Sequence, residues 1–168
     1  AFHGWDAMML YGYSQDAIRA STTDVWSSHN NPAILGLMPA AALLYRAGHV
    51  APAVSTIMVK LDRRNTFLQS RTPRNSRTLR TLSEMHRLVI ALPDAPELDW
   101  DAESPLHPDI ATVTDLDEDF IPPGQNFVES DTGEIRRDWE LGIQTISTPQ
   151  SVAAIGWLRG NPLELGPV

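Results

Sequence analysis

A group of aromatic and polar residues near the start of the sequence has the chemistry of a carbohydrate-binding surface. Aromatic rings stack on sugar rings, and carboxylate or imidazole groups bond sugar hydroxyls, so together they supply contact area and orientation. The group consists of Tyr11, Tyr13, Asp24, Trp26 and His29. We interpret these residues as candidates for substrate binding. Core packing is the alternative for the aromatic residues, and a capping or loop-stabilising role is the alternative for Asp24 and His29.

Bond cleavage in a glycosidase would require two carboxyl groups, about 5 Å apart in a retaining enzyme and further apart in an inverting one. The carboxylates that cluster on expected regular structure are Glu129, Asp131, Glu134 and Asp138. They belong to an expected hairpin, where a solvated rim is the plainer interpretation than a catalytic pair. The catalytic residues of this chain therefore stay unknown.

Metal and nucleophile motifs are poorly matched. The acidic run Asp115, Asp117, Glu118 and Asp119 lacks the glycine and the final glutamate of a calcium loop. The five histidines show no spacing typical of zinc ligands, and no GxSxG motif is present. We expect no metal site and no cofactor.

Composition limits the classes of partner. The 168 residues carry a formal net charge of −8, which argues against nucleic-acid binding because phosphates require a positive surface. No apolar run approaches the length of about 20 residues that a membrane span requires, so we expect no membrane partner. The absence of cysteine leaves the compartment open, with a periplasmic or secreted location favoured.

The charge is unevenly distributed along the chain. Residues 60–87 contain eight basic residues against two acidic ones, whereas residues 94–140 contain fifteen acidic residues against two arginines. Opposite charges attract when they lie close together. We therefore expect the two blocks to face one another within the fold or between subunits.

The candidate binding residues follow or flank a short apolar run, Met8–Tyr11, which is typical of a strand covered on both faces. After a long polar loop, Asn31 and Pro32 predict the start of a helix as N-cap and first residue. The apolar stripe of that helix ends before Gly48, and Pro39 within it predicts a bend. The opening therefore indicates a strand, a loop and a helix.

The remaining sequence suggests four further elements or segments. Ala53–Leu61 is rich in β-branched residues and predicts a strand. Pro73–Leu92 has apolar residues at helical spacing and predicts a helix with arginines on its flank. Pro93–Gln125, with six prolines and ten of the 21 acidic residues, predicts a long loop or linker with little structure. The last third predicts antiparallel strands, beginning with a hairpin around Asp131-Thr132-Gly133.

These elements predict an α/β front unit of a partial β/α-barrel type, followed by a small antiparallel β-domain. We divide the chain into a strand–helix unit at 1–50, a connecting strand and basic-flanked helix at 51–92, an acidic proline-rich loop at 93–125 and an antiparallel β segment at 126–168.

Two stretches resemble a known family. HGWDAMMLYGYS, followed by HNNPAILGLMPAAALLYRAGHVAPA, resembles the eighth strand and helix of bacterial retaining glycoside hydrolases of the large (β/α)8-barrel clan. ESDTGEIRRDWELGIQTISTPQSVAAIGWLRG resembles the β-rich segment that follows the barrel in the same proteins. In that clan the two catalytic glutamates lie at the ends of strands four and seven, and no residue of this chain matches them.

The resemblance implies a glycoside hydrolase, or its C-terminal portion, that acts on an oligosaccharide or polysaccharide. The alternative is a non-catalytic carbohydrate-binding or oligomerisation module. An incomplete strand–helix unit leaves apolar surface uncovered, so we expect a homo-oligomer or the remainder of a larger barrel as its partner.

Overall fold

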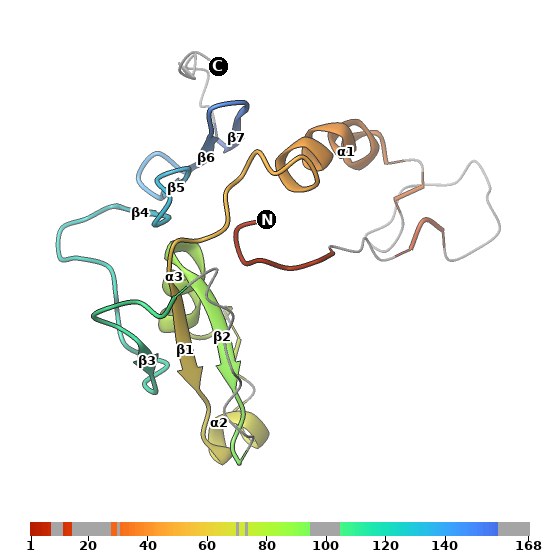
Figure 1. Ribbon diagram of the computed structural model, residues 1–168. Coiled ribbons are helices and arrows are strands. Elements are labelled where there is room, and N and C mark those ends of the chain that lie inside the picture. The colour runs from red at the N-terminus through yellow and green to blue at the C-terminus, as the bar shows by residue number, and fades with distance from the viewer. Residues whose placement is uncertain are drawn as a thin grey trace.

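The computed structural model describes residues 1–7, 12–14, 28–29, 31–69, 71–72, 74–94 and 105–157. Two sheets organise these residues, a three-stranded sheet and a four-stranded sheet. Figure 1 shows the two sheets in separate regions, with helix α1 (Pro32–Tyr45) standing apart from both. The chain therefore consists of an α/β unit followed by an antiparallel β unit. The parallel sheet is built from residues 56–113, and the strand predicted at Met8–Tyr11 lies outside the described residues.

The first sheet is parallel throughout. Its order is β2 (Arg87–Ala91), β1 (Thr56–Lys60) and β3 (Thr112–Val113). The short helix α2 (Arg63–Phe67) follows β1, and α3 (Arg77–Met85) leads into β2. Parallel neighbours need a crossover connection, which the segment containing α2 and α3 supplies here.

Helix α3 begins later and ends earlier than the predicted Pro73–Leu92. The Ser76 hydroxyl caps its start by accepting a hydrogen bond from the Leu79 amide at 3.1 Å. The prediction of one helix reaching Leu92 is wrong, because His86 is extended and Arg87–Ala91 forms β2. The apolar residues of β2 continue the helical spacing by coincidence. Because the segment contains the β-branched residues Val89 and Ile90, it favours a strand that hydrogen-bonds with β1 over a continued helix.

The acidic segment is also more structured than predicted. It contributes β3, and Val113 and Leu116 are buried at 5% and 3% exposure. Thr78 donates its hydroxyl to the carbonyl oxygens of Asp115 and Glu118, which holds this segment against α3. Polar residues flank both apolar side chains, threonines at Val113 and aspartates at Leu116, so the segment contributes to the core without showing any sustained periodicity.

The core of the α/β unit lies between α3, β1 and the acidic segment. One cluster contains Ile57, Leu82 and Val113, and a second contains Val59, Leu79 and Leu116. The alternate residues Ile57 and Val59 are both fully buried, which matches the two-residue period of a strand.

The second sheet confirms the predicted antiparallel strands. Its order is β4 (Phe127–Glu129), β5 (Ile135–Asp138), β6 (Ile143–Ser147) and β7 (Val152–Gly156), and each strand pairs with the next. The β4–β5 turn contains the expected Asp131-Thr132-Gly133, with Gly133 at a φ of 71°. A positive φ is available to glycine at little cost, which explains this residue in the turn.

The two charge blocks meet within the fold, which is one of the two arrangements that the sequence predicts. Arg63 from the basic block pairs with Asp94, and Arg71 pairs with Asp117. The first pair is largely exposed, so it contributes little to stability.

Candidate functional site

The structure brings together two of the five predicted binding residues. Tyr13 and His29 lie with their ring centres 5.5 Å apart in an edge-to-face arrangement, and the His29 amide donates to the Tyr13 carbonyl oxygen at 2.8 Å. Tyr11, Asp24 and Trp26 lie outside the described residues. The Tyr13 side chain is exposed, so its ring is available for contact with a ligand.

Helix α1 follows this pair and begins as predicted. The Asn31 side chain accepts a hydrogen bond from the Ile34 amide at 3.2 Å, and Pro32 is the first helical residue. Gly48 has a φ of 69° just beyond the last turn, consistent with the predicted left-handed stop.

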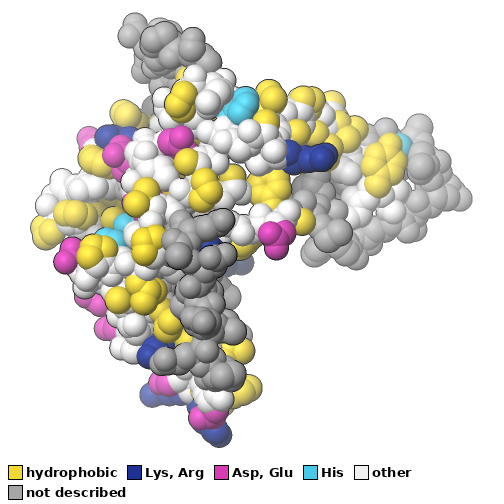
Figure 2. Space-filling model, in the orientation of Figure 1, with side chains coloured by type: hydrophobic (Ala, Val, Ile, Leu, Met, Phe, Trp, Pro, Cys, Tyr) yellow, Lys and Arg dark blue, Asp and Glu magenta, His cyan; other side chains and the backbone are white. Residues whose placement is uncertain are grey.

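The surface of α1 is unusual because none of its residues is buried. Its sequence, PAILGLMPAAALLY, contains no charged residue, so apolar side chains face every direction. Figure 2 shows hydrophobic side chains along the arm that α1 forms. One side forms a wall of a groove of about 320 Å³. The described residues lining it are Ile34, Leu37, Met38, Ala41, Ala42, Tyr45 and Arg46. A helix that is hydrophobic all round is normally buried in a larger structure.

The helix is attached to the body of the protein at its end. Phe2, Val50 and Ala53 form a buried cluster, against which Ile135 and Ile146 of the antiparallel sheet pack. His49 Nδ1 also lies 2.6 Å from the Ser151 hydroxyl in the β6–β7 turn. The exposed helix is therefore held at a defined position by its C-terminal end.

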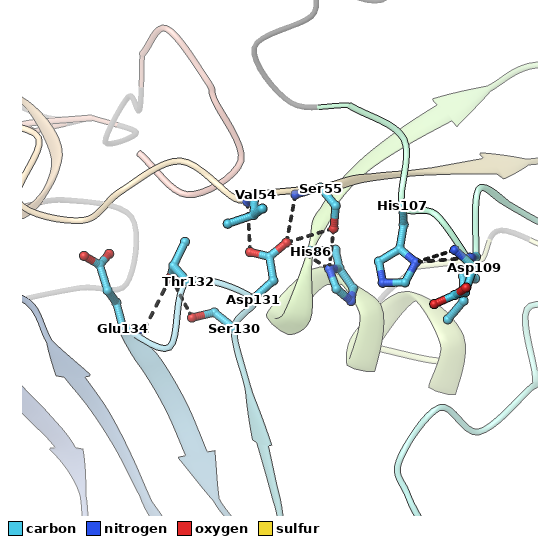
Figure 3. Close-up of polar contacts among 10 residues, drawn as sticks. Val54, Ser55, His86, His107, Asp109, Ser130, Asp131, Thr132 and Glu134 are labelled. Carbon is cyan, nitrogen blue, oxygen red and sulfur yellow. Dashed lines mark hydrogen bonds and ion pairs between the residues drawn. The ribbon is translucent and has the colours of Figure 1, made fainter.

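A second polar site, which was not predicted from the sequence, joins the two sheets. Its centre is Asp131 in the β4–β5 turn, shown in Figure 3. One carboxylate oxygen accepts the Val54 amide at 3.0 Å, and the other accepts both the amide and the hydroxyl of Ser55 at 2.9 Å. His86 Nδ1 lies 3.0 Å from the same second oxygen. We call Ser55, His86 and Asp131 the junction cluster.

Burial of the carboxylate raises the pKa of Asp131, but the hydrogen bonds outweigh this effect. The bonds come from His86, from the amides of Val54 and Ser55, and from the Ser55 hydroxyl, and together they hold the pKa of Asp131 below its ordinary value of 3.8. An ionised carboxylate only accepts hydrogen bonds, so His86 Nδ1 carries the proton that it donates to Asp131.

The junction cluster has the residue types of a catalytic triad but not its geometry. In such a triad the acid and the hydroxyl contact opposite nitrogens of the imidazole. Here Ser55 Oγ and Asp131 Oδ2 both contact Nδ1 of His86, at 2.9 and 3.0 Å. The hydroxyl is therefore not activated by a base behind it, and the arrangement favours a structural role.

A neighbouring histidine completes the surroundings. The rings of His86 and His107 are 4.8 Å apart at an interplanar angle of 72°. His107 Nδ1 accepts the amides of Asp109 and Ile110 at 3.2 and 3.1 Å. This nitrogen is therefore unprotonated, and the His107 ring serves as an acceptor that organises the loop before β3.

The interpretation of the hairpin carboxylates as a solvated rim fits Glu129, whose side chain is 45% exposed, but is wrong for the buried Asp138. Glu134 accepts the Ala51 amide at 2.7 Å, and Asp138, which is buried, accepts the Leu141 amide at 2.9 Å. Glu129 and Asp138 both lie near Arg136, at 3.9 and 3.5 Å. Their contacts are with amides and guanidinium groups of the protein itself.

Within the described residues, no group of three or more histidine and carboxylate residues is arranged to hold a metal ion. Likewise, no helix in the described ranges has the length and apolar character needed to cross a membrane. Comparison of the chain with protein-family models, with curated proteins and with solved structures gave no match.

Proposed function

We propose that this chain is a C-terminal portion of a (β/α)8-barrel glycoside hydrolase. In this role α1 packs against the remainder of the barrel, and exposed aromatic residues contact the carbohydrate. The two catalytic glutamates lie outside this sequence. The proposal combines the resemblance of the two sequence stretches with one structural observation, an uncharged apolar helix in which no residue is buried and only the last turn is half-buried.

The exposure of α1 carries the proposal. Leu37, Met38 and Leu43 are exposed at 66%, 44% and 50%. Exposed apolar surface of this kind marks an interaction site, and burying it stabilises an assembly by about 25 cal/mol per Å². The last helix of a barrel would bury such a surface against its neighbours.

The role of the carboxylates supports a non-catalytic portion. A glycosidase holds its two carboxyl groups around a scissile bond. In the hairpin, each carboxylate is instead held by an amide or a guanidinium group of the chain.

A non-catalytic oligomerisation module is the second candidate function, and the same helix favours it. Two copies of the chain could cover their apolar helices by mutual packing. Light scattering distinguishes the candidates: a stable dimer of the 168-residue chain, lost on Leu37→Asp, supports the module. A monomer supports the barrel portion.

The main experiment extends the coding sequence upstream and compares the longer product with the 168-residue chain on aryl glycosides. We expect turnover by the longer product alone. Leu37→Asp in the longer product should abolish activity, because it places a charge within the buried barrel wall. Leu68→Asp is the matched control, since Leu68 is exposed at 80% beyond the carboxyl end of β1, and it should retain activity. Turnover by the short chain that is lost on mutation of one of its carboxylates would refute the proposal.

A direct test of carbohydrate contact uses Tyr13→Ala in the active longer product. Loss of a stacking ring should raise KM for an oligosaccharide with a smaller effect on a short aryl glycoside. Trp157→Ala is the matched control, because Trp157 is also exposed, at 78%, but lies at the end of the antiparallel sheet. Equal effects of the two substitutions would contradict a specific role for Tyr13.

A further inference from the structure

We propose that the Asp131 carboxylate is an acid-released latch that holds the β4–β5 turn on the amino ends of β1 and β2. The latch is independent of the proposed carbohydrate function. It follows from the way in which one side chain joins segments that are far apart in the sequence.

The contacts of Asp131 reach both neighbouring strands of the parallel sheet. Val54 and Ser55 immediately precede β1, and His86 immediately precedes β2. The Asp131 amide also donates to the Met85 carbonyl oxygen at 2.8 Å, so the backbone of the turn sits on the last residue of α3. Figure 3 shows the carboxylate between these partners.

Every side-chain contact of the latch places a donor on the Asp131 carboxylate. Two amides and a hydroxyl donate to it, and His86 donates from a ring nitrogen. A protonated carboxyl group still accepts hydrogen bonds, but it also places one hydrogen among these donors. Protonation therefore sets donor against donor in a site where the side chain is only 13% exposed.

The other charged groups around the latch are already engaged. Glu84 of α3 is paired with Arg137 of β5 at 2.6 Å, and Glu134 in the turn accepts the Ala51 amide. From the loop before β3, His107 faces His86, and its Nδ1 is held by the amides of Asp109 and Ile110. The Arg87 guanidinium lies against Gly4. Asp131 is therefore the carboxylate whose protonation acts directly on the junction.

The acid response has a definite sign. The pKa of Asp131 is depressed in the folded protein, so the contribution of its ionised form is present above the ordinary pKa of 3.8. That contribution is lost as the pH falls through the lower folded value. The amides of Val54, Ser55 and Asp131 should then exchange while the interior of the parallel sheet remains protected.

Hydrogen exchange of the full chain tests this sequence of events. Protection factors, each relative to an unstructured peptide at the same pH, are measured between pH about 7 and about 2. Asp131→Asn imitates the protonated carboxyl at neutral pH. Asp117→Asn is the control, because Asp117 forms an exposed ion pair with Arg71 away from the junction. The Met58 amide, which donates to the Ala111 carbonyl oxygen, reports on the parallel sheet.

We expect Asp131→Asn to lower protection of the three junction amides by about tenfold or more at pH about 7, and to remove their response to acid. Met58 should stay protected, and Asp117→Asn should behave as wild type. Three results would overturn the latch: a wild type whose junction stays protected at pH about 2, a variant with wild-type protection at neutral pH, or simultaneous loss at Met58 and the junction. If Asp131→Asn does not fold, the wild-type titration alone decides between these outcomes.

Discussion

Replacing Leu116 by alanine should destabilise the whole α/β unit, although Leu116 lies in a segment with the composition of a linker. The side chain is 3% exposed and packs with Val59 and Leu79, while Leu61 and Leu88 pack around the same cluster. Truncation of a leucine in such a site removes its transfer free energy and leaves a cavity. The expected loss in the free energy of unfolding is about 2–5 kcal/mol.

This loss is large beside the total stability of a small domain, which is about 5–15 kcal/mol. Urea unfolding followed by circular dichroism measures it as a shift in midpoint at constant slope. Leu106→Ala is the matched control, because Leu106 belongs to the same acidic segment but is 43% exposed. Its cost should stay under about 1 kcal/mol, in proportion to the smaller buried area.

Equal midpoints for the two variants would refute the structural interpretation. They would mean that the segment after residue 105 lies on the surface as a linker, as its composition suggests. A large shift for Leu116→Ala alone would show that it is part of the core.

Three further results are expected. Gly156→Ala should disrupt the pairing of β6 with β7, because the added Cβ atom would lie 2.3 Å from the Gly142 carbonyl oxygen. At Gly36 an added Cβ atom would meet no other atom within 4 Å, so Gly36→Ala should raise the melting temperature slightly. Acidification below pH 3.8 should lower the free energy of unfolding of wild type more than that of Asp131→Asn, since the pKa of Asp131 is depressed in the folded state. A double-mutant cycle on Glu84 and Arg137 should give a coupling under about 1 kcal/mol, because both side chains are roughly one-third exposed; a larger coupling would contradict a solvent-screened pair.

Local chemistry made some elements predictable. Asn31 and Pro32 define a helix start whatever surrounds them, because an N-cap and a first-turn proline act through their own backbone. Asp131-Thr132-Gly133 defines a hairpin for the same reason, since the glycine supplies a positive φ. Both features are present in the structure as predicted.

Long-range pairing was not predictable in the same way. The apolar residues of 87–91 fit a helix and a strand equally well, and pairing with β1 decides between them. The junction cluster shows the same limit, because Ser55, His86 and Asp131 are separated by 31 and 45 residues. One signal in the sequence was available: Ser55 and His86 each immediately precede a segment rich in β-branched residues. If both segments form neighbouring parallel strands, the residues before them lie side by side at the same edge of the sheet.

The location of the junction cluster bears on the function of the chain. Ligands of open parallel sheets bind beyond the carboxyl ends of the strands. The junction cluster lies at the opposite end, before the first residues of β1 and β2. At the carboxyl ends the described residues include the exposed ion pair Arg63–Asp94 and the exposed apolar side chains of Phe67 and Leu68. The polar cluster with the most catalytic composition therefore joins the two sheets and lies away from the end at which ligands of parallel sheets bind.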